Sequence, residues 1–164
     1  MILSVLRIIY WTTWGSAGSV KRADMDGSNA SVIATGLSYP CGIAIDFQAS
    51  RIYWTVAEES RVESGDMQGK NVQRVKQFPS GSWTFGIAVY GNRIYVTNYS
   101  LQKLQSFNTA GQDLQEVHTD TNNLLHLAVI STRPDRPNTR ANSCEYHGCS
   151  KVCVLTRTAF KCFT

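Results

Sequence analysis

The chain has 164 residues, of which 43% are apolar and 17% are charged, and its formal net charge is +4. It is long enough for one ordinary domain with a small appendage, and apolar enough to bury a core. Lysine and arginine never form a run, which argues against a nucleic-acid partner, and no apolar stretch approaches the roughly 18 residues needed to span a bilayer.

A strand-like segment that begins with tyrosine recurs at a spacing of 42 to 43 residues, as Tyr10-Trp11-Thr12, Tyr53-Trp54-Thr55 and Tyr95-Val96-Thr97. Each copy is followed in register by a turn that contains glycine, at 25–29, 67–71 and 109–113. Such turns supply the positive backbone angles of tight hairpins. A period of roughly 40 to 45 residues with about four short strands predicts the blades of a β-propeller.

Residue alternation and turn chemistry predict an all-β chain. The first repeat has three expected strands, at 8–11, 20–24 and 31–34. The second repeat has four, at 42–46, 51–55, 61–65 and 72–76. The third also has four, at 85–89, 93–97, 103–108 and 114–117, and one further strand is expected at 125–130.

Large aromatic residues stand on both faces of these strands, because successive side chains point to opposite sides of a sheet. We therefore expect the repeated aromatic residues to wedge between neighbouring blades as scaffolding. They are Tyr10, Trp11, Tyr53, Trp54 and Tyr95.

The Tyr-Trp-Thr segments, the Asp-Gly-Ser-Asn turn at 26–29 and the strand Gly42-Ile43-Ala44-Ile45-Asp46 together resemble the YWTD repeat of the low-density lipoprotein receptor family. The resemblance implies a partial six-bladed YWTD-type β-propeller of about three blades, built from class B repeats, at 1–137. In that family the final strand becomes the innermost strand of the first blade, so 125–130 is expected to complete the first sheet.

Three blades do not close a ring, and a complete ring is how a propeller protects its sheet edges. The missing blades would come from the same parent chain or from a second copy in a homodimer. Three interpretations stay open: a partial gene product, a gene model that omits upstream blades, and a half-propeller that pairs three blades with three.

The sequence departs from the family pattern at the aspartate that ends the motif, where it has Thr13, Val56 and Asn98. In the family this carboxylate ties blades together through backbone hydrogen bonds. Threonine and asparagine offer a neutral oxygen, whereas valine offers none. Each lost charge-assisted bond is expected to cost about 1 to 3 kcal/mol and to give a less rigid propeller.

Four of the five cysteines lie close together near the C-terminus, at Cys144, Cys149, Cys153 and Cys162. This compact spacing predicts a disulfide framework and an oxidising compartment, with a zinc knuckle that includes His147 as the alternative.

The tail at 138–164 is similar to a truncated EGF-like module. That resemblance implies disulfides between Cys144 and Cys153 and between Cys149 and Cys162. It implies no calcium site, because the residues before Cys144 are not acidic. Cys41 has no obvious partner and is expected to be a buried free thiol.

Two N-glycosylation sequons begin at Asn29 and Asn98. The three histidines, His118, His126 and His147, are scattered and follow no recognisable nucleophile, so neither a catalytic residue nor a cofactor is predicted. His118 and His126 are the candidates for an acid switch, because histidine is the side chain used for switches near neutral pH.

The family resemblance implies a non-catalytic, extracellular protein-binding module. It would be part of the ectodomain of an endocytic or signalling receptor, including Wnt co-receptor-like receptors. The alternative is a secreted or basement-membrane matrix protein in which the propeller is structural.

Overall fold

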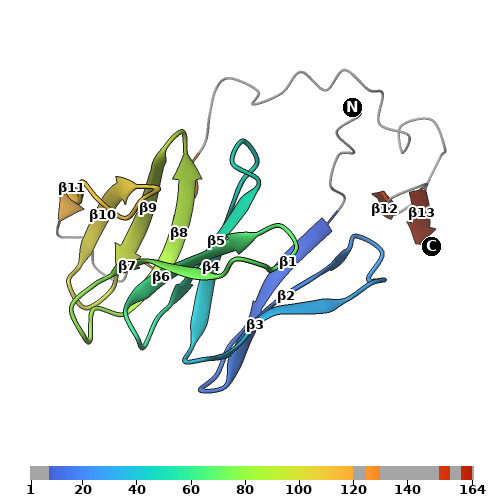
Figure 1. The fold of residues 1–164 in the computed structure, drawn as a ribbon, viewed down its shortest axis with the longest axis horizontal. Coiled ribbons are helices and arrows are strands. Elements are labelled where there is room, and N and C mark those ends of the chain that lie inside the picture. Colours follow the sequence, from blue (N-terminus) through green and yellow to red (C-terminus); the bar gives the residue numbers. More distant parts are fainter. Residues whose placement is uncertain (1–7, 120–124, 130–151, 156–159, 164) are drawn as a thin grey trace. The chain divides into compact units, whose positions relative to one another are not determined.

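The computed structural model describes residues 8–119, 125–129, 152–155 and 160–163, and in the last two ranges only the backbone is described. Every regular element in these ranges is a β-strand (Figure 1). None of the described residues belongs to a helix long and apolar enough to cross a membrane.

Three sheets follow one another along the chain, in agreement with the three predicted repeats. The first has the order β1 (Ile8–Thr13), β2 (Gly18–Asp24), β3 (Ser31–Leu37). The second has the order β4 (Pro40–Asp46), β5 (Arg51–Val56), β6 (Arg61–Asp66), β7 (Gln73–Gln77). The third consists of β8 (Thr84–Tyr90), β9 (Arg93–Asn98), β10 (Lys103–Asn108) and β11 (Gln115–Thr119). Both four-stranded sheets are antiparallel meanders, which is the arrangement of a propeller blade.

The same turn connects the last two strands of each sheet. Between β6 and β7 the Asp66 N–H donates to the Lys70 carbonyl at 2.9 Å, and the Gly69 N–H donates to the Asp66 carbonyl at 3.0 Å. Gly69 adopts a φ of 83°, a left-handed value that favours glycine. The Asp66 carboxylate accepts the N–H groups of Lys70 and Gln68, and these bonds hold its pKa below its usual value.

The motif aromatics of the second repeat are fully buried. Tyr53 belongs to a core cluster with Val62, Phe78, Ile87, Ile94, Val96 and Phe107. Trp54 points to the opposite face of the sheet and donates its indole N–H to Glu63 at 3.0 Å. Tyr10, Trp11 and Tyr95 are half-buried.

Threonine hydroxyls of the motif connect each sheet to the innermost strand of the next. Thr12 donates to the Cys41 carbonyl at 2.8 Å, and Thr55 donates to the Phe85 carbonyl at 2.7 Å. The Thr55 hydroxyl also accepts the Gly42 N–H at 2.9 Å. The third motif position therefore carries a link between blades, a role that the sequence analysis gave to the fourth position.

Residues at the fourth motif position bond mainly within their own sheet. Asn98 is buried; its carbonyl accepts the Thr84 hydroxyl at 2.7 Å, and its amide donates to Gln105. Thr13 and Ser19 share a hydrogen bond between their hydroxyls at 2.8 Å.

Val56 faces an apolar residue across the strand pair, contrary to the expected cost of losing the aspartate. Its register partner on β4 is Pro40, at the place where Thr84 faces Asn98 in the next sheet. Both side chains are buried. Replacing both members of a buried hydrogen-bonded pair by apolar groups is nearly neutral. We therefore withdraw the predicted penalty of about 1 to 3 kcal/mol at this position.

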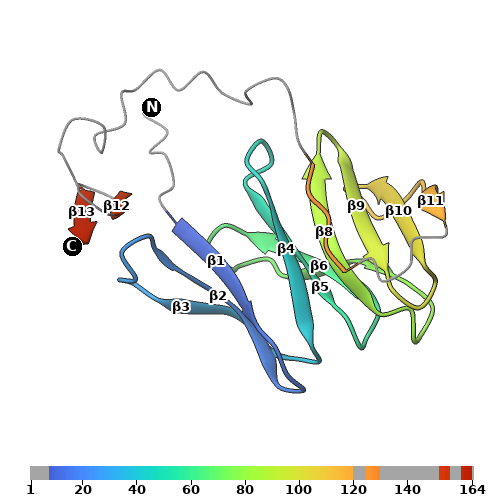
Figure 2. The ribbon, with the colours of Figure 1, turned by 180° about the vertical axis from the view of Figure 1, so that it is seen from behind.

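The expected ring-closing strand at 125–130 is wrong. Residues 125–129 have no strand assignment, and the first sheet has only three strands among the described residues. This segment lies beside β8 (Figure 2), where a Cβ placed on Gly86 would stand 3.0 Å from the Leu125 carbonyl oxygen and 3.1 Å from the Leu127 nitrogen. Each sheet is followed around the ring by the innermost strand of the next sheet. The segment at 125–129 lies beside β8 in the position that such a strand would have after the third sheet, and it does not return to the first sheet.

The region of the expected EGF-like module is described only as a hairpin of β12 (Val152–Leu155) and β13 (Phe160–Phe163). Cys153 and Cys162 are register partners in this hairpin. Cys144, Cys149 and His147 lie outside the described residues, so the disulfides and the module stay predictions.

Candidate functional site

Five aromatic side chains, four from loops and one from the start of β8, form one continuous cluster, which we call the aromatic face: Trp14, Tyr39, Trp83, Phe85 and Tyr99. The ring centroids of Trp14 and Tyr39 are 4.8 Å apart, and those of Tyr39 and Trp83 are 6.2 Å apart. Phe85 lies 6.1 Å from both Trp14 and Trp83, with its ring within 18° of parallel to each. Tyr99 meets Phe85 edge-on at 5.8 Å. All five belong to one compact unit, Trp11–Lys21 with Val32–Ile130.

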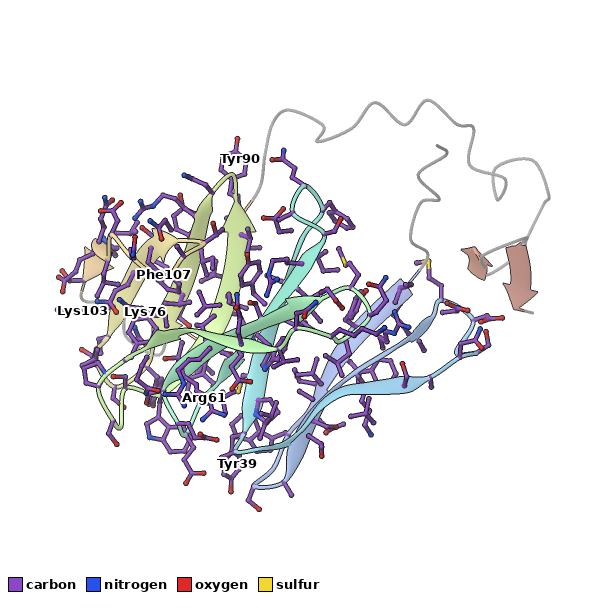
Figure 3. All side chains as sticks on the ribbon, in the orientation of Figure 1. Tyr39, Arg61, Lys76, Tyr90, Lys103 and Phe107 are labelled. Atoms are coloured by element: carbon purple, nitrogen blue, oxygen red, sulfur yellow. The ribbon has the colours of Figure 1, made fainter. Side chains whose placement is uncertain are left out.

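The aromatic face is open to solvent. Trp14 is 59% exposed and Tyr99 is 42% exposed, while the other three rings are half-buried. Figure 3 shows Tyr39 at one end of the sheets and the exposed Tyr90 at the opposite end. Contiguous exposed aromatic surface is typical of an interaction site.

Backbone hydrogen bonds hold the loops of the aromatic face to one another. The Tyr39 N–H donates to the Gly15 carbonyl at 2.8 Å, and the Tyr99 N–H donates to the Trp83 carbonyl at 3.0 Å. Tyr39 and Trp83 occupy equivalent positions just before β4 and β8, and both adopt left-handed φ values, 57° and 51°. Such values are strained for bulky residues, and this strain gathers at functional sites. The face is therefore held in one arrangement before any partner binds.

A pocket of about 320 Å³ opens beside Trp14 and Phe85. The remaining lining residues come from the ends of β1 and β4 and from the segment at 125–129; they are Thr12, Pro40, Cys41, Gly42, Leu125 and His126. The Thr12 hydroxyl donates to the Cys41 carbonyl, and the Cys41 thiol donates to the Tyr39 carbonyl at 3.4 Å. The pocket is mainly apolar and suits an apolar side chain of a partner.

Cys41 is a free thiol, as expected, but it is half-buried instead of buried; partial burial still raises its pKa to about 12. The thiolate is the reactive form of cysteine, so the folded protein keeps this residue inert at neutral pH. At pH 8 we expect iodoacetamide to alkylate Cys41 at least about 100-fold more slowly in the folded chain than in denaturant. Mass spectrometry of the peptide that contains Cys41 measures both rates, and equal rates would contradict the burial argument.

The two predicted glycan sites have different surroundings. Asn29 lies in the exposed turn after β2, where its amide donates to Asp24 at 2.7 Å. Asn98 is completely buried and both ends of its amide are hydrogen-bonded. Only Asn29 offers room for a glycan in the folded chain, and glycosylation there stays a prediction.

The two histidines proposed as an acid switch belong to different elements. His118 is on the exposed outermost strand β11, whereas His126 lines the pocket beside the aromatic face. His126 is therefore the one that a ligand at this site would meet, and the switch itself stays a prediction.

The sequence analysis missed the residues of the aromatic face, although a weak signal was present. Tyr39 and Trp83 directly precede the innermost strands of successive repeats. Trp14 and Tyr99 each follow the fourth motif position. Aromatic residues at equivalent loop positions of a repeat indicate a shared surface, because all such loops emerge at one end of the blades.

Comparison with known proteins finds similar chains among receptors. No family model matches the chain. It is 26% identical over 151 residues to the vitellogenin receptor Yl of Drosophila melanogaster, and 27% identical over 153 residues to low-density lipoprotein receptor-related protein 5 of Homo sapiens. These alignments cover 90% and 91% of the chain. The chain is thus similar to members of the low-density lipoprotein receptor family.

The chain spans less than a tenth of the length of these relatives, 7% and 9%. A chain in the crystal structure of a nidogen/laminin complex matches it with a TM-score of 0.62 and 25% identity, over 71% of this chain and 46% of that one. The three sheets are thus blades of a YWTD-type β-propeller. The relatives named here are receptors.

Proposed function

We propose that the chain is the extracellular protein-binding module of an endocytic or signalling receptor, and that the aromatic face is its contact surface. The observation that carries the proposal is the cluster of five rings, open to solvent and held by hydrogen-bonded loops. Tryptophan and tyrosine are enriched at the energetic centres of protein interfaces. The adjoining pocket provides a place for an anchoring side chain.

The similarity to receptors supports a receptor role for this chain, and we propose that this role is endocytic or Wnt co-receptor-like signalling. The likeness to a chain of the nidogen/laminin complex favours the alternative, a matrix protein that binds laminin. In both cases the chain acts outside the cell, its partner is an extracellular protein, and no catalytic step is required.

Replacing Trp14 by alanine is expected to weaken binding of the protein ligand about tenfold or more, because truncation of a central tryptophan typically costs at least 1.4 kcal/mol. The measurement is surface plasmon resonance of vitellogenin and laminin over the immobilised full chain. Binding of vitellogenin favours the receptor role, and binding of laminin favours the matrix role.

The matched control is Tyr90→Ala, which removes another exposed aromatic side chain from the opposite end of the sheets (Figure 3). Its affinity is expected to equal that of the unmodified chain. Unchanged binding in Trp14→Ala together with weakened binding in Tyr90→Ala would contradict the proposal. It would place the contact surface at the end of the sheets that carries Tyr90.

A further inference from the structure

The sequon that begins at Asn98 lies inside the third blade. Asn98 is on β9, and its register partners are Thr84 on β8 and Lys103 on β10, so a strand stands on each side of it (Figure 1). Asn98 and Thr84 are 0% exposed, and Gln105 is 5% exposed. A sugar on Asn98 therefore has no room while these three strands are paired.

The atom that would carry a glycan is already engaged in the folded blade. An N-linked glycan is attached to the side-chain nitrogen of asparagine. In Asn98 this nitrogen donates to the side-chain carbonyl of Gln105, and the Asn98 side-chain carbonyl accepts the Thr84 hydroxyl at 2.7 Å. Modifying Asn98 thus requires a buried hydrogen-bond network to open, and its groups are costly to leave without partners.

The backbone of the sequon is also held by the fold. The Tyr99 N–H donates to the Trp83 carbonyl at 3.0 Å, and the Ser100 N–H donates to the Ser82 carbonyl at 3.2 Å. An enzyme that transfers a glycan must reach the sequon at an accessible surface segment. The folded blade instead fixes this segment to the loop that precedes β8.

The sequon that begins at Asn29 has the opposite character. Asn29 is exposed in the turn after β2, and its amide donates to Asp24 at 2.7 Å. The chain therefore contains one sequon that the folded protein exposes and a second sequon, at Asn98, that only the unfolded protein exposes.

The contacts that bury Asn98 are local in sequence. Thr84 precedes it by 14 residues and Gln105 follows it by 7 residues. At a synthesis rate of about 5 to 20 residues per second, Gln105 is made within roughly 0.4 to 1.4 s after Asn98. A hairpin then forms in about 1 to 10 μs. Asn98 is open to a modifying enzyme for a short time only, unless folding of the third blade is delayed.

We propose that Asn98 is a glycosylation site of the unfolded chain alone, and that a glycan there and the folded third blade exclude each other. A chain that folds in time buries Asn98 unmodified. A chain that folds late receives a sugar that the paired strands cannot accommodate, so it stays unfolded and is not secreted. The inference goes beyond the proposed binding function and needs only passage through the secretory pathway.

The chemical step is a group transfer from a lipid-linked oligosaccharide diphosphate. The side-chain nitrogen of Asn98 forms a bond to the anomeric carbon of the oligosaccharide. The bond between that carbon and the diphosphate breaks, the nitrogen gives up one proton, and the lipid diphosphate leaves. No oxidation or reduction takes place. The reacting nitrogen is the one that bonds to Gln105 in the folded blade, which is why the two states compete.

The test expresses the full chain behind a secretion signal in mammalian cells and compares the secreted protein with the protein retained in the cells. Enzymatic removal of the glycans in heavy-oxygen water converts each occupied asparagine to a labelled aspartate, which mass spectrometry of the peptides quantifies. In the secreted chain, the occupancy of Asn98 is expected to be at least about tenfold lower than that of Asn29, because only rare local unfolding exposes Asn98.

Thr84→Val has nearly the same shape and removes the hydroxyl that bonds to Asn98, so it slows the burial of Asn98. We expect about threefold or more glycan at Asn98 in the retained variant, and less secretion. Adding Ser100→Ala removes the sequon, keeps the backbone N–H and should restore secretion. Ser31→Ala is the control, because it removes the sequon of Asn29 instead and should restore none.

A loss of secretion that persists in the double variant Thr84→Val, Ser100→Ala would overturn the inference, because it would assign the loss to the hydrogen bond alone. Similar occupancy of Asn29 and Asn98 in the secreted chain would also overturn it, as would a retained Thr84→Val chain without glycan at Asn98. None of these measurements involves a ligand. The proposed function is judged separately, by whether Trp14→Ala weakens binding of the protein ligands.

Discussion

Replacing Gly42 by alanine is expected to destabilise the propeller blades by about 3 kcal/mol or more, because it forces a methyl group into a close backbone approach between two blades. A Cβ at Gly42 would stand 2.5 Å from the Phe85 carbonyl oxygen and 3.0 Å from the Ile87 nitrogen. Both are backbone atoms of β8, so neither can move without displacing the strand. Thermal unfolding followed by circular dichroism should show a midpoint lower by about 6 to 12 °C.

Gly65→Ala is the matched control for this prediction. Gly65 also lies in a strand of the second blade, but a Cβ there would meet its nearest neighbours at 3.4 Å, close to ordinary contact. Its expected effect is below about 1 kcal/mol, since alanine also favours ordered backbone over glycine. An equal loss in the two variants would show that the blade contact at Gly42 is not tighter than the rest of the sheet.

Most of the fold could be predicted from the sequence, because the patterns that specify the strands and turns are local. Repeated Tyr-Trp-Thr strands and glycine turns specify hairpins within one blade, and strands β1 to β11 match predicted ones with changes of a few residues at their ends. The turn at 66–71, for example, contains the Asp66 and Gly69 groups that close it, so nothing distant is required.

What the sequence did not predict depends on contacts between blades. The path of 125–129 beside β8 is set by how far three blades extend around the ring, which no local pattern encodes. The aromatic face is assembled from loops far apart in sequence, so Trp14 and Phe85 show no relation until the blades are stacked. The compensation between Val56 and Pro40 is likewise visible only in the strand register.

Replacing Thr55 by valine is expected to lower the free energy of unfolding by about 2 to 4 kcal/mol, although valine has nearly the same shape. The buried Thr55 hydroxyl donates to the Phe85 carbonyl and accepts the Gly42 N–H. The β4–β5 register is irregular between Pro40 and Ile43, so Gly42 is outside the regular ladder and depends on this side chain. Removing the hydroxyl leaves a part-buried donor, the Gly42 N–H, and a part-buried acceptor, the Phe85 carbonyl, without this partner.

Thr55→Ser retains the hydroxyl and loses only a methyl group, so it should cost about 1 kcal/mol, and denaturant unfolding of the two variants separates the hydrogen bonds from packing. A serine variant as unstable as the valine variant would assign the loss to the methyl group. Because Gly42→Ala displaces the same contact, the double variant Gly42→Ala, Thr55→Val should be less destabilised than the sum of the single variants. A fully additive result would mean that the glycine contact and the threonine hydrogen bonds stabilise the blades independently.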